Sequence, residues 1–171
     1  MDKKIILYIA TSLDGFIAKE DGNIDWLTKY DNSGEDYGFK ELYESVGTVL
    51  IGGATHRQIE DPHAGKEVYI FSKKEPKHKA DNFHFVSGDV QTIIENIKLG
   101  DNKNMWLVGG ADLVNQFLDA NLIDEYIVTI IPILLGEGIA LFQNKNPEQN
   151  LKLLKIKSYD SELVQLHYTK E

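Results

Sequence analysis

Apolar and polar positions along the first two thirds of the chain form a pattern of strands separated by helices. Short apolar runs of strand length occupy residues 4–10, 46–51, 67–71, 83–86 and 104–108. Between them, apolar residues recur at helical spacing from Phe39, from Val90 and from Ala111, and a weaker helical pattern starts near Thr55. Asp89 is a candidate N-cap for the helix at Val90. Strands that alternate with helices in this way predict an α/β fold whose sheet contains parallel pairs.

The last third of the chain has a different pattern, in which strands follow one another without helices. These strands are expected at 124–134, roughly 151–158 and 162–169. Along the third of them, Val164, Leu166 and Tyr168 alternate with Leu163, Gln165 and His167. Pro132 indicates a bulge or a strand edge within the first, because proline cannot donate to a ladder. The predicted fold class is therefore α/β, with a mixed, mostly parallel sheet flanked by helices and antiparallel C-terminal strands.

Length and composition limit the classes of protein to which the chain can belong. Its 171 residues, 42% of them apolar and 26% charged, suit one folded domain over residues 1–171. A net charge of -9 argues against nucleic acid or an anionic membrane as the main partner. The absence of cysteine excludes disulfides, thiolate metal sites and cysteine nucleophiles, and it is compatible with the cytoplasmic location that we expect. The apolar stretch Ile5–Ala10 is too short for a signal-peptide core or a membrane span.

Two of the apolar runs end in a glycine pair at the point where a helical pattern begins. Residues 48–51 lead into Gly52–Gly53, and residues 105–108 lead into Gly109–Gly110. Glycine allows positive φ and close approach of a ligand, and free amides at a helix N-terminus favour phosphate oxygens. Two such junctions suit a ligand with several phosphates, and a dinucleotide is the first candidate. Each pair alone is equally compatible with an ordinary tight turn between a strand and a helix.

Several short motifs occur in an order and spacing that are more specific than any one of them. They are 12–18 (SLDGFIA), 24–27 (IDWL), 107–111 (LVGGA), 122–125 (LIDE) and 132–138 (PILLGEG). Together they resemble the dihydrofolate reductase-like family, nearest the stand-alone relatives of the RibD C-terminal reductase domain of riboflavin biosynthesis. The resemblance extends from about residue 4 to 168. It implies a three-layer fold with a sheet of about eight strands, which binds NADPH across the C-terminal ends of the parallel strands.

The resemblance assigns the nicotinamide end of the site to residues near the first strand. Ala10 ends that strand beside the nicotinamide, and Ile17 lies across the ring. The loop that contains Gly22 and Ile24 resembles the family's mobile loop over the nicotinamide. Trp26, in the same loop, is the aromatic residue that we expect to face the substrate.

The two glycine junctions resemble the family's phosphate contacts, with one departure. The family's turn at the pyrophosphate, in which a non-proline cis peptide often joins the glycines, is matched by Val108, Gly109, Gly110 and Ala111. At the other junction the family typically has Gly-Arg-x-Thr, whose arginine holds the adenosine 2′-phosphate, and this chain has Gly52-Gly53-Ala54-Thr55. Gly53 therefore stands at the arginine position, whereas Thr55 keeps a hydroxyl that can meet a phosphate. The preference for NADPH over NADH stays open.

Two groups of cations are candidates to replace that arginine. Arg57 lies half a turn after Thr55 on the weaker predicted helix. Ser72, Lys73 and Lys74 follow the strand at 67–71, where the family contacts the adenosine end. A lysine there acts as a point charge, without the bidentate geometry of arginine. The alternative is a solvated lysine pair in a loop, and the sequence leaves both open.

Asp36 is the candidate for a proton donor in the substrate pocket. Dihydrofolate reductases carry a carboxylate on the helix ahead of the Gly-Arg-x-Thr strand, and the same separation from Gly52 falls on Asp36. The alternative is that Asp36 and Glu35 complement the positive N-terminus of the helix at Phe39. No pair of histidines has the i, i+4 spacing with an acidic partner that is typical of zinc sites, so we expect no metal.

Two hypotheses for the function follow. The first is an NAD(P)H-dependent reductase that transfers a hydride to a pterin-like or ribosylaminopyrimidine-like small molecule, in the manner of a 5-amino-6-(5-phosphoribosylamino)uracil reductase. The second is a dinucleotide-binding protein that keeps the fold without catalysis, which the missing arginine favours. Relatives of this kind often dimerise, so we expect a homodimer. Its surface could come from apolar residues of the C-terminal third, which are equally compatible with buried core: Ile130, Ile131, Ile133 and Leu134.

Overall fold

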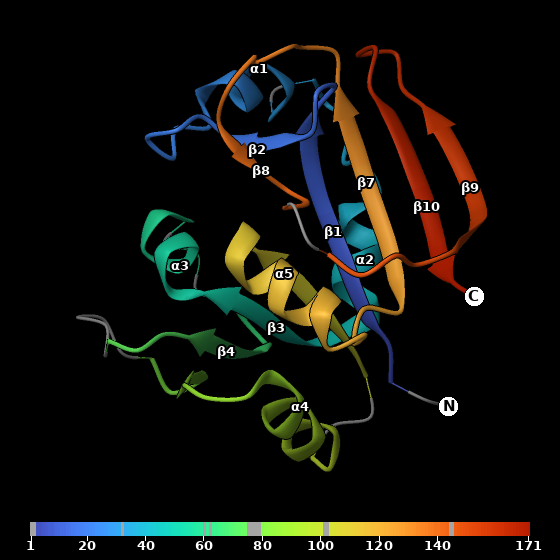
Figure 1. The fold of residues 1–171 in the computed structure, drawn as a ribbon. Coiled ribbons are helices and arrows are strands. Elements are labelled where there is room, and N and C mark those ends of the chain that lie inside the picture. The colour runs from blue at the N-terminus through green and yellow to red at the C-terminus, as the bar shows by residue number, and fades with distance from the viewer. Residues whose placement is uncertain are drawn as a thin grey trace.

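The computed structural model describes residues 3–31, 33–59, 61, 63–74, 80–100, 103–143 and 146–171. An eight-stranded sheet forms the centre of the molecule (Figure 1). Its strands in chain order are β1 (Ile5–Ser12), β3 (Val46–Gly52), β4 (Glu67–Phe71), β5 (Phe83–Val86), β6 (Asn104–Gly109), β7 (Glu125–Ile131), β9 (Leu151–Ser158) and β10 (Val164–Lys170). Their order across the sheet is β5-β4-β3-β6-β1-β7-β10-β9. Two short strands, β2 (Phe16–Ala18) and β8 (Ile139–Ala140), form a separate antiparallel pair.

The strand directions confirm the predicted mixed sheet. All neighbours from β5 to β7 are parallel. β10 is antiparallel to β7 on one side and to β9 on the other. β7 therefore joins the antiparallel C-terminal strands to the parallel part of the sheet through its pairing with β1. The carboxyl ends of the parallel strands meet at one edge, where the two glycine junctions lie.

Helices cover both faces of the parallel part of the sheet (Figure 1). They are η1 (Asp25–Leu27, a 3-10 turn), α1 (Thr28–Asp31), α2 (Phe39–Ser45), α3 (Gly53–Ile59), α4 (Val90–Lys98) and α5 (Ala111–Asp119). Successive strand residues point to opposite faces. Accordingly, Leu50 and Leu107 pack with α4 and α5, whereas Val49 and Trp106 pack on the α2 side. Within the described ranges, no helix is long and apolar enough to cross a membrane.

β7 ends at Ile131 rather than at residue 134, because Pro132 has no N–H to donate. The chain turns there: the Ile133 N–H donates to the Ile131 carbonyl (2.8 Å), and the Leu13 N–H donates to the Ile133 carbonyl (2.9 Å). The interruption predicted at Pro132 is thus confirmed. Ile131 is only 2% exposed and belongs to the core, whereas Leu134 is 69% exposed. The apolar residues considered for a dimer surface therefore do not lie on one face.

A charged network fixes the start of β1 to β7 and β10. Glu125 is buried and accepts hydrogen bonds from Lys4 Nζ (2.6 Å) and His167 Nε2 (2.8 Å). Burial by itself would raise the pKa of Glu125, but the bonds from Lys4 and His167 outweigh it and the pKa is lowered. The Asp124 carboxylate accepts from the Ile5 N–H (2.9 Å). These bonds set the register of the strand whose other end borders the site.

Candidate functional site

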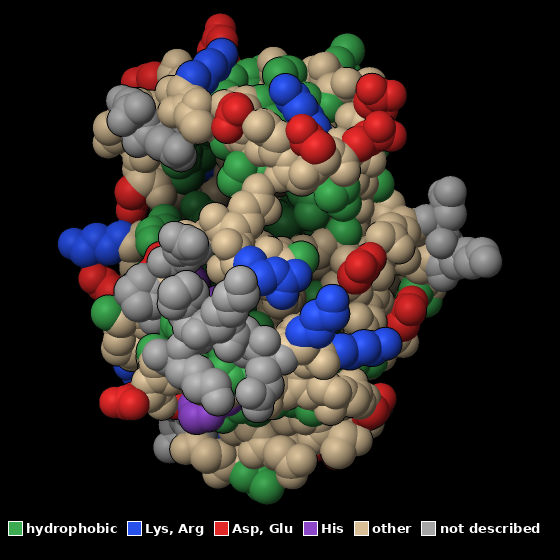
Figure 2. Space-filling model, turned by 90° about the vertical axis from the view of Figure 1, so that its left-hand side faces the viewer, with side chains coloured by type: hydrophobic (Ala, Val, Ile, Leu, Met, Phe, Trp, Pro, Cys, Tyr) green, Lys and Arg blue, Asp and Glu red, His purple; other side chains and the backbone are tan. Residues whose placement is uncertain are grey.

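A cavity of about 800 Å³ lies at the carboxyl ends of the parallel strands. Residues from the ends of β1, β3, β4 and β6 line it, together with α3, the start of α5 and part of the segment 17–27. Figure 2 views the molecule from this side and shows hydrophobic side chains within a hollow and Lys and Arg side chains below it. Ligand sites of cofactor size have volumes in this range.

The two glycine junctions are in direct contact, because β3 and β6 are neighbours and Ile51 pairs with Gly109. A Cβ atom on Gly52 would lie 3.3 Å from the Gly110 nitrogen, and one on Gly110 would lie 2.9 Å from Thr55 Oγ1. Larger residues would therefore separate the two junctions. The peptide between Gly109 and Gly110 is cis, as the resemblance implied, and Gly109 has a φ of +113°. Both junctions and Thr55 thus form one wall of the cavity.

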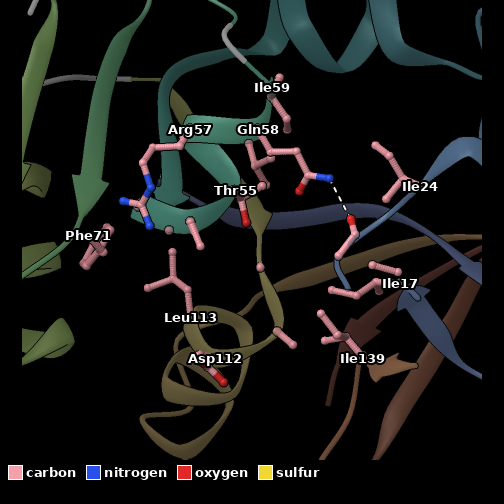
Figure 3. Close-up of a pocket in the computed structure, with 18 of the residues that line it drawn as sticks. Ile17, Ile24, Thr55, Arg57, Gln58, Ile59, Phe71, Asp112, Leu113 and Ile139 are labelled. Carbon is pink, nitrogen blue, oxygen red and sulfur yellow. Dashed lines mark hydrogen bonds between the residues drawn. The ribbon is translucent and has the colours of Figure 1, made fainter. Parts of the chain in front are cut away.

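Arg57 reaches back to the start of its own helix. A Cβ atom on Gly53 would lie 2.7 Å from both Cβ and Oγ of Ser72, and 3.5 Å from Nη1 of Arg57. A side chain at Gly53 would therefore displace Ser72, while the guanidinium of Arg57 already lies beside that position. Figure 3 shows Arg57 extending from α3 toward Phe71. The structure therefore brings Arg57 into the site, which the sequence left open.

Lys73 and Lys74 line the same end of the cavity as Arg57. The loop that carries them is shaped by Ser72, whose hydroxyl donates to the Lys74 carbonyl (2.8 Å) and accepts from the Lys74 N–H (3.1 Å). Among the described residues, three cationic side chains thus border one end of the cavity, one from α3 and two from the loop after β4. Because the chain as a whole is acidic, an anion is favoured here by local placement of charge rather than by the overall field.

Most of the residues that line the opposite end of the cavity are apolar, and Asp21 of the segment 17–27 is the charged residue among those described that lines the cavity beside them. Ala10, Ile17, Ile24 and Leu27 line it, and Val108 borders it from β6. Such walls exclude water and strengthen any polar interaction formed between them. The apolar end and the cationic end lie on either side of the glycine wall, so the cavity changes in character along its length.

A side-chain hydrogen bond joins α3 to the loop over the cavity. Gln58 Nε2 donates to the Gly22 carbonyl at 2.6 Å, and Figure 3 shows this bond between α3 and the segment that leads to Ile24. Gly22 has a φ of +84°, a conformation that glycine adopts readily. The bond connects two elements that both line the cavity, and it gives Gln58 a role that sequence patterns did not reveal.

Trp26 and Asp36 do not line the cavity. Trp26 packs with Ala10 in an adjacent cluster, and its buried indole N–H has no hydrogen-bond partner among the described residues. The Asp36 carboxylate accepts backbone N–H groups from Gly38 (3.1 Å) and Lys40 (3.3 Å), and the bond from Gly38 contributes most to lowering its pKa. A carboxyl held ionised in this way is a poor proton donor at neutral pH. The structure therefore favours the alternative role for Asp36, in which its charge complements the positive N-terminus of α2.

Two signals for the additional site residues are visible in the sequence once the helix is known. Gly53 and Arg57 are four residues apart, so α3 places them on one face. Gln58 follows directly and points to the neighbouring part of the cavity rim. Neither feature is diagnostic alone, because a short helix with these spacings is common.

Known proteins similar to this chain have the same architecture. Residues 63–165 match the RibD C-terminal domain family. Over 175 residues the chain is 38% identical to the protein YwjB of Bacillus subtilis (strain 168), and the match covers 99% of both. A solved protein of Shewanella sp. PV-4, named for riboflavin biosynthesis, shares 29% identity with a TM-score of 0.89 over 98% of this chain and 99% of its own.

A solved structure with lower sequence identity has the same fold. Dihydrofolate reductase from Enterococcus faecalis, solved in complex with NADP(H), has a TM-score of 0.67 at 15% identity, covering 98% of this chain and 96% of its own. At this identity the likeness concerns the fold alone. Together with the family match and the identity to YwjB, it confirms the dihydrofolate reductase-like fold that the motifs implied. The chain therefore belongs to the RibD C-terminal domain family, which is a reductase-like family.

Proposed function

We propose that this protein is an NADPH-dependent reductase of small heteroaromatic molecules, with the dinucleotide lying along the cavity. The observation that carries the proposal is the order of surfaces along the cavity: a cationic end, a wall of two glycine junctions and an apolar end. NADPH has the matching order of groups, with a 2′-phosphate at the adenosine end, a pyrophosphate in the middle and an uncharged ring in its reduced nicotinamide.

The middle of the cavity fits a pyrophosphate. Gly110 and Ala111 begin α5, whose first N–H groups have no partner within the helix, and the helix dipole favours an anion there. The bare backbone at Gly110 and the nearby Thr55 hydroxyl allow close approach of phosphate oxygens. Asp112 in the same turn opposes an anion, but its carboxylate accepts from Gln143 Nε2 (3.3 Å). We infer that Gly110, Ala111 and Thr55 hold the pyrophosphate.

The cationic end fits the adenosine 2′-phosphate. Arg57 presents a planar guanidinium whose paired N–H groups match two phosphate oxygens, and Lys73 and Lys74 add point charges. Gly53 has no room for the side chain that the family typically carries there. We infer that Arg57 replaces that arginine from one turn further along α3. The preference for NADPH over NADH would then rest on Arg57.

The apolar end fits the nicotinamide ring. When bound, NADPH would supply the hydride, and the chain's own residues would orient the ring and exclude water. The small side chain of Ala10 leaves room at the end of β1, and Ile17 and Ile24 provide apolar walls. The unpartnered indole N–H of Trp26 belongs to the cluster that contains Ala10. Trp26 does not line the cavity, so we infer that a pterin-like or ribosylaminopyrimidine-like substrate meets the apolar walls rather than this indole.

Turnover tests this function directly. Oxidation of NADPH would be followed with a panel of pterins and aminopyrimidines, each with and without a ribosyl phosphate. We expect oxidation with at least one compound. Ala10→Leu should lower that rate, because the larger side chain occupies space at the ring end. Leu99→Ala is a matched apolar control: Leu99 is 87% exposed and does not line the cavity, so the rate should be unchanged.

A second candidate function is a dinucleotide-binding protein without turnover. The placement of Asp36 favours it, because the carboxylate expected to donate a proton instead accepts backbone bonds at the start of α2. Saturable binding of NADPH without oxidation across the whole panel would support this candidate and reject the reductase.

A further inference from the structure

A carboxylate outside the cavity joins two loops that are distant in the sequence. Asp14 lies in the turn between β1 and β2 and does not line the cavity. Its Oδ1 accepts from Ser12 Oγ (2.6 Å) and from the Leu135 N–H (3.1 Å), and its Oδ2 accepts from the Gly136 N–H (2.8 Å). Hydrogen bonds to an ionised acceptor are stronger than those between neutral groups. Asp14 therefore holds the loop after β7 against the turn after β1.

The hydroxyl of Ser12 connects this carboxylate to the start of β2. Ser12 is buried, and its Oγ donates to Asp14 while it accepts from the Phe16 N–H (2.9 Å). The bond from Ser12 contributes most to lowering the pKa of Asp14, and the bonds from the Gly136 and Leu135 N–H groups lower it further. The Asp14 carboxylate is therefore charged at neutral pH and accepts all three bonds.

The two loops lead into the short strands that form part of the wall at the apolar end of the cavity. β2 and β8 are antiparallel, with Ala18 opposite Ile139. Ile17, Ala18 and Ile139 all line the cavity. The strands contain only three and two residues, and an isolated pair of strands is at best marginally stable in water. The position of this wall must therefore depend on the loops that lead into its strands.

A second polar side chain holds the chain on the other side of β8. Asn115 is buried on α5, and its Nδ2 donates to the Ala111 carbonyl (2.6 Å) and to the Leu141 carbonyl (3.3 Å). Its Oδ1 accepts from the Gln143 N–H (3.2 Å). β8 is thus held by Asp14 before the strand and by Asn115 after it. Loss of the Asp14 bonds should therefore change the position of β8 without unfolding the domain.

We propose that Asp14 is a positioning residue for the nicotinamide end of the site, a role that rests on the proposed reductase function. Its bonds to Leu135 and Gly136 fix the loop that leads into β8, and pairing of β8 with β2 then places Ile139 and Ile17 against the ring. Hydride transfer requires a closely defined geometry, and a displacement of about 1 Å can lower a rate about a hundredfold. Because Asp14 does not line the cavity, it should affect the rate more than the affinity for the dinucleotide.

Asp14→Asn tests the proposal, because an amide nitrogen in place of one carboxylate oxygen cannot accept a bond from an N–H. Asp81→Asn is the matched control, since Asp81 is exposed, lies in the turn before β5 and does not line the cavity. We expect Asp14→Asn to lower kcat by about tenfold to a hundredfold while the Kd of NADPH changes by less than about threefold. Asp81→Asn should change neither quantity, and thermal melting shows whether both variants fold.

Backbone amide hydrogen exchange in the free protein measures the same effect without cofactor or substrate. The Leu135 and Gly136 N–H groups donate to Asp14, and the Leu141 N–H donates to the Gly15 carbonyl (3.0 Å). Exchange at these three amides should be faster in Asp14→Asn than in Asp81→Asn. Ser12→Ala removes one bond to the carboxylate and should change the same amides in the same direction. It takes the place of Asp14→Asn if that variant does not fold.

Several results would overturn the proposal. Unchanged amide exchange in Asp14→Asn would show that the carboxylate does not hold the loop, whatever the activity of the wild type. Faster exchange with an unchanged kcat would mean that the bonds are structural only. A loss of NADPH affinity as large as the loss of kcat would place the effect in binding rather than in positioning.

The test also separates this proposal from the reductase function. A wild type that binds NADPH but reduces no compound would reject the function, and the fluorescence anisotropy of the bound nicotinamide then decides. A lower anisotropy in Asp14→Asn than in Asp81→Asn would support positioning of the ring, and equal values would refute it. A wild type that binds no NADPH would overturn both proposals.

Discussion

Replacing Arg57 with alanine tests the adenosine end of the proposed site without changing the residues at its other end. The Arg57 guanidinium lies beside Gly53 and Ser72. These residues are at the cationic end of the cavity, opposite the apolar walls around Ala10. NADPH and NADH differ only in the 2′-phosphate at the adenosine end. If Arg57 holds that phosphate, the substitution should weaken the binding of NADPH and leave the binding of NADH unchanged.

The size of the effect follows from the exposure of Arg57. A hydrogen bond to a charged group contributes about 1.5–3 kcal/mol. Arg57 is exposed, so solvent and salt screen its charge and the lower end applies. About 1.5 kcal/mol corresponds to about a tenfold increase in the Kd of NADPH. Arg57→Lys keeps the charge without the paired donors. Its Kd for NADPH should therefore lie between those of the wild type and Arg57→Ala.

Titration of both variants with NADPH and NADH, followed by nicotinamide fluorescence at low and high salt, measures this difference. The Arg57→Ala effect on NADPH should shrink as salt rises. Thermal melting controls for the integrity of α3. Equal weakening of NADPH and NADH would place Arg57 outside the phosphate contact and mean that it supports the site structurally. An unchanged Kd for both would refute the replacement of the family's arginine by Arg57.

Three other changes test the packing and electrostatics around the site. Gly53→Ala places a methyl carbon 2.7 Å from Ser72 Cβ, and we expect urea unfolding to show a loss of about 1–3 kcal/mol. The Gly53→Ala/Ser72→Gly double variant should recover most of that loss, whereas strictly additive losses would contradict the clash. Gln58→Ala removes the bond to the Gly22 carbonyl, so stopped-flow measurements should show faster NADPH dissociation, and an unchanged rate would exclude a role in closing the cavity. The folded-state pKa of Glu125 is lowered from its ordinary 4.5, so its stabilising contribution is complete above that pH and is lost as pH falls through the folded value. Glu125→Gln should therefore flatten the acid limb of the stability curve, and an identical limb would disprove this contribution.

Periodicity in the sequence was sufficient to predict the main strands and helices. The alternation around Leu50 and Val49 and the helical spacing from Val90 depend on local burial, which a single sequence records well. The parallel pairing of β7 with β1 is different, because Ile6 and Glu125 are brought together only by the completed sheet. The short β2 and β8 have too few residues for a pattern.

The candidate site was predictable where it depends on backbone and less so where it depends on side-chain paths. The Gly52–Gly53 and Gly109–Gly110 junctions were visible because glycine has a specific conformational role. The reach of Arg57 depends on the absence of a side chain at Gly53 and on the position of Ser72, which directly follows β4. Counting along a loop to Asp36 could not reveal that its carboxylate accepts backbone N–H groups from Gly38 and Lys40.

Binding of the two dinucleotides to the wild-type protein tests the central claim most directly. The purified chain would be titrated in parallel with NADPH and NADH, with tryptophan quenching and nicotinamide fluorescence as independent signals. The account predicts saturable binding of both, with NADPH tighter than NADH by about tenfold or more, as expected from one added charge-assisted contact. Failure of either dinucleotide to bind at millimolar concentration would contradict it and leave the fold without the proposed cofactor.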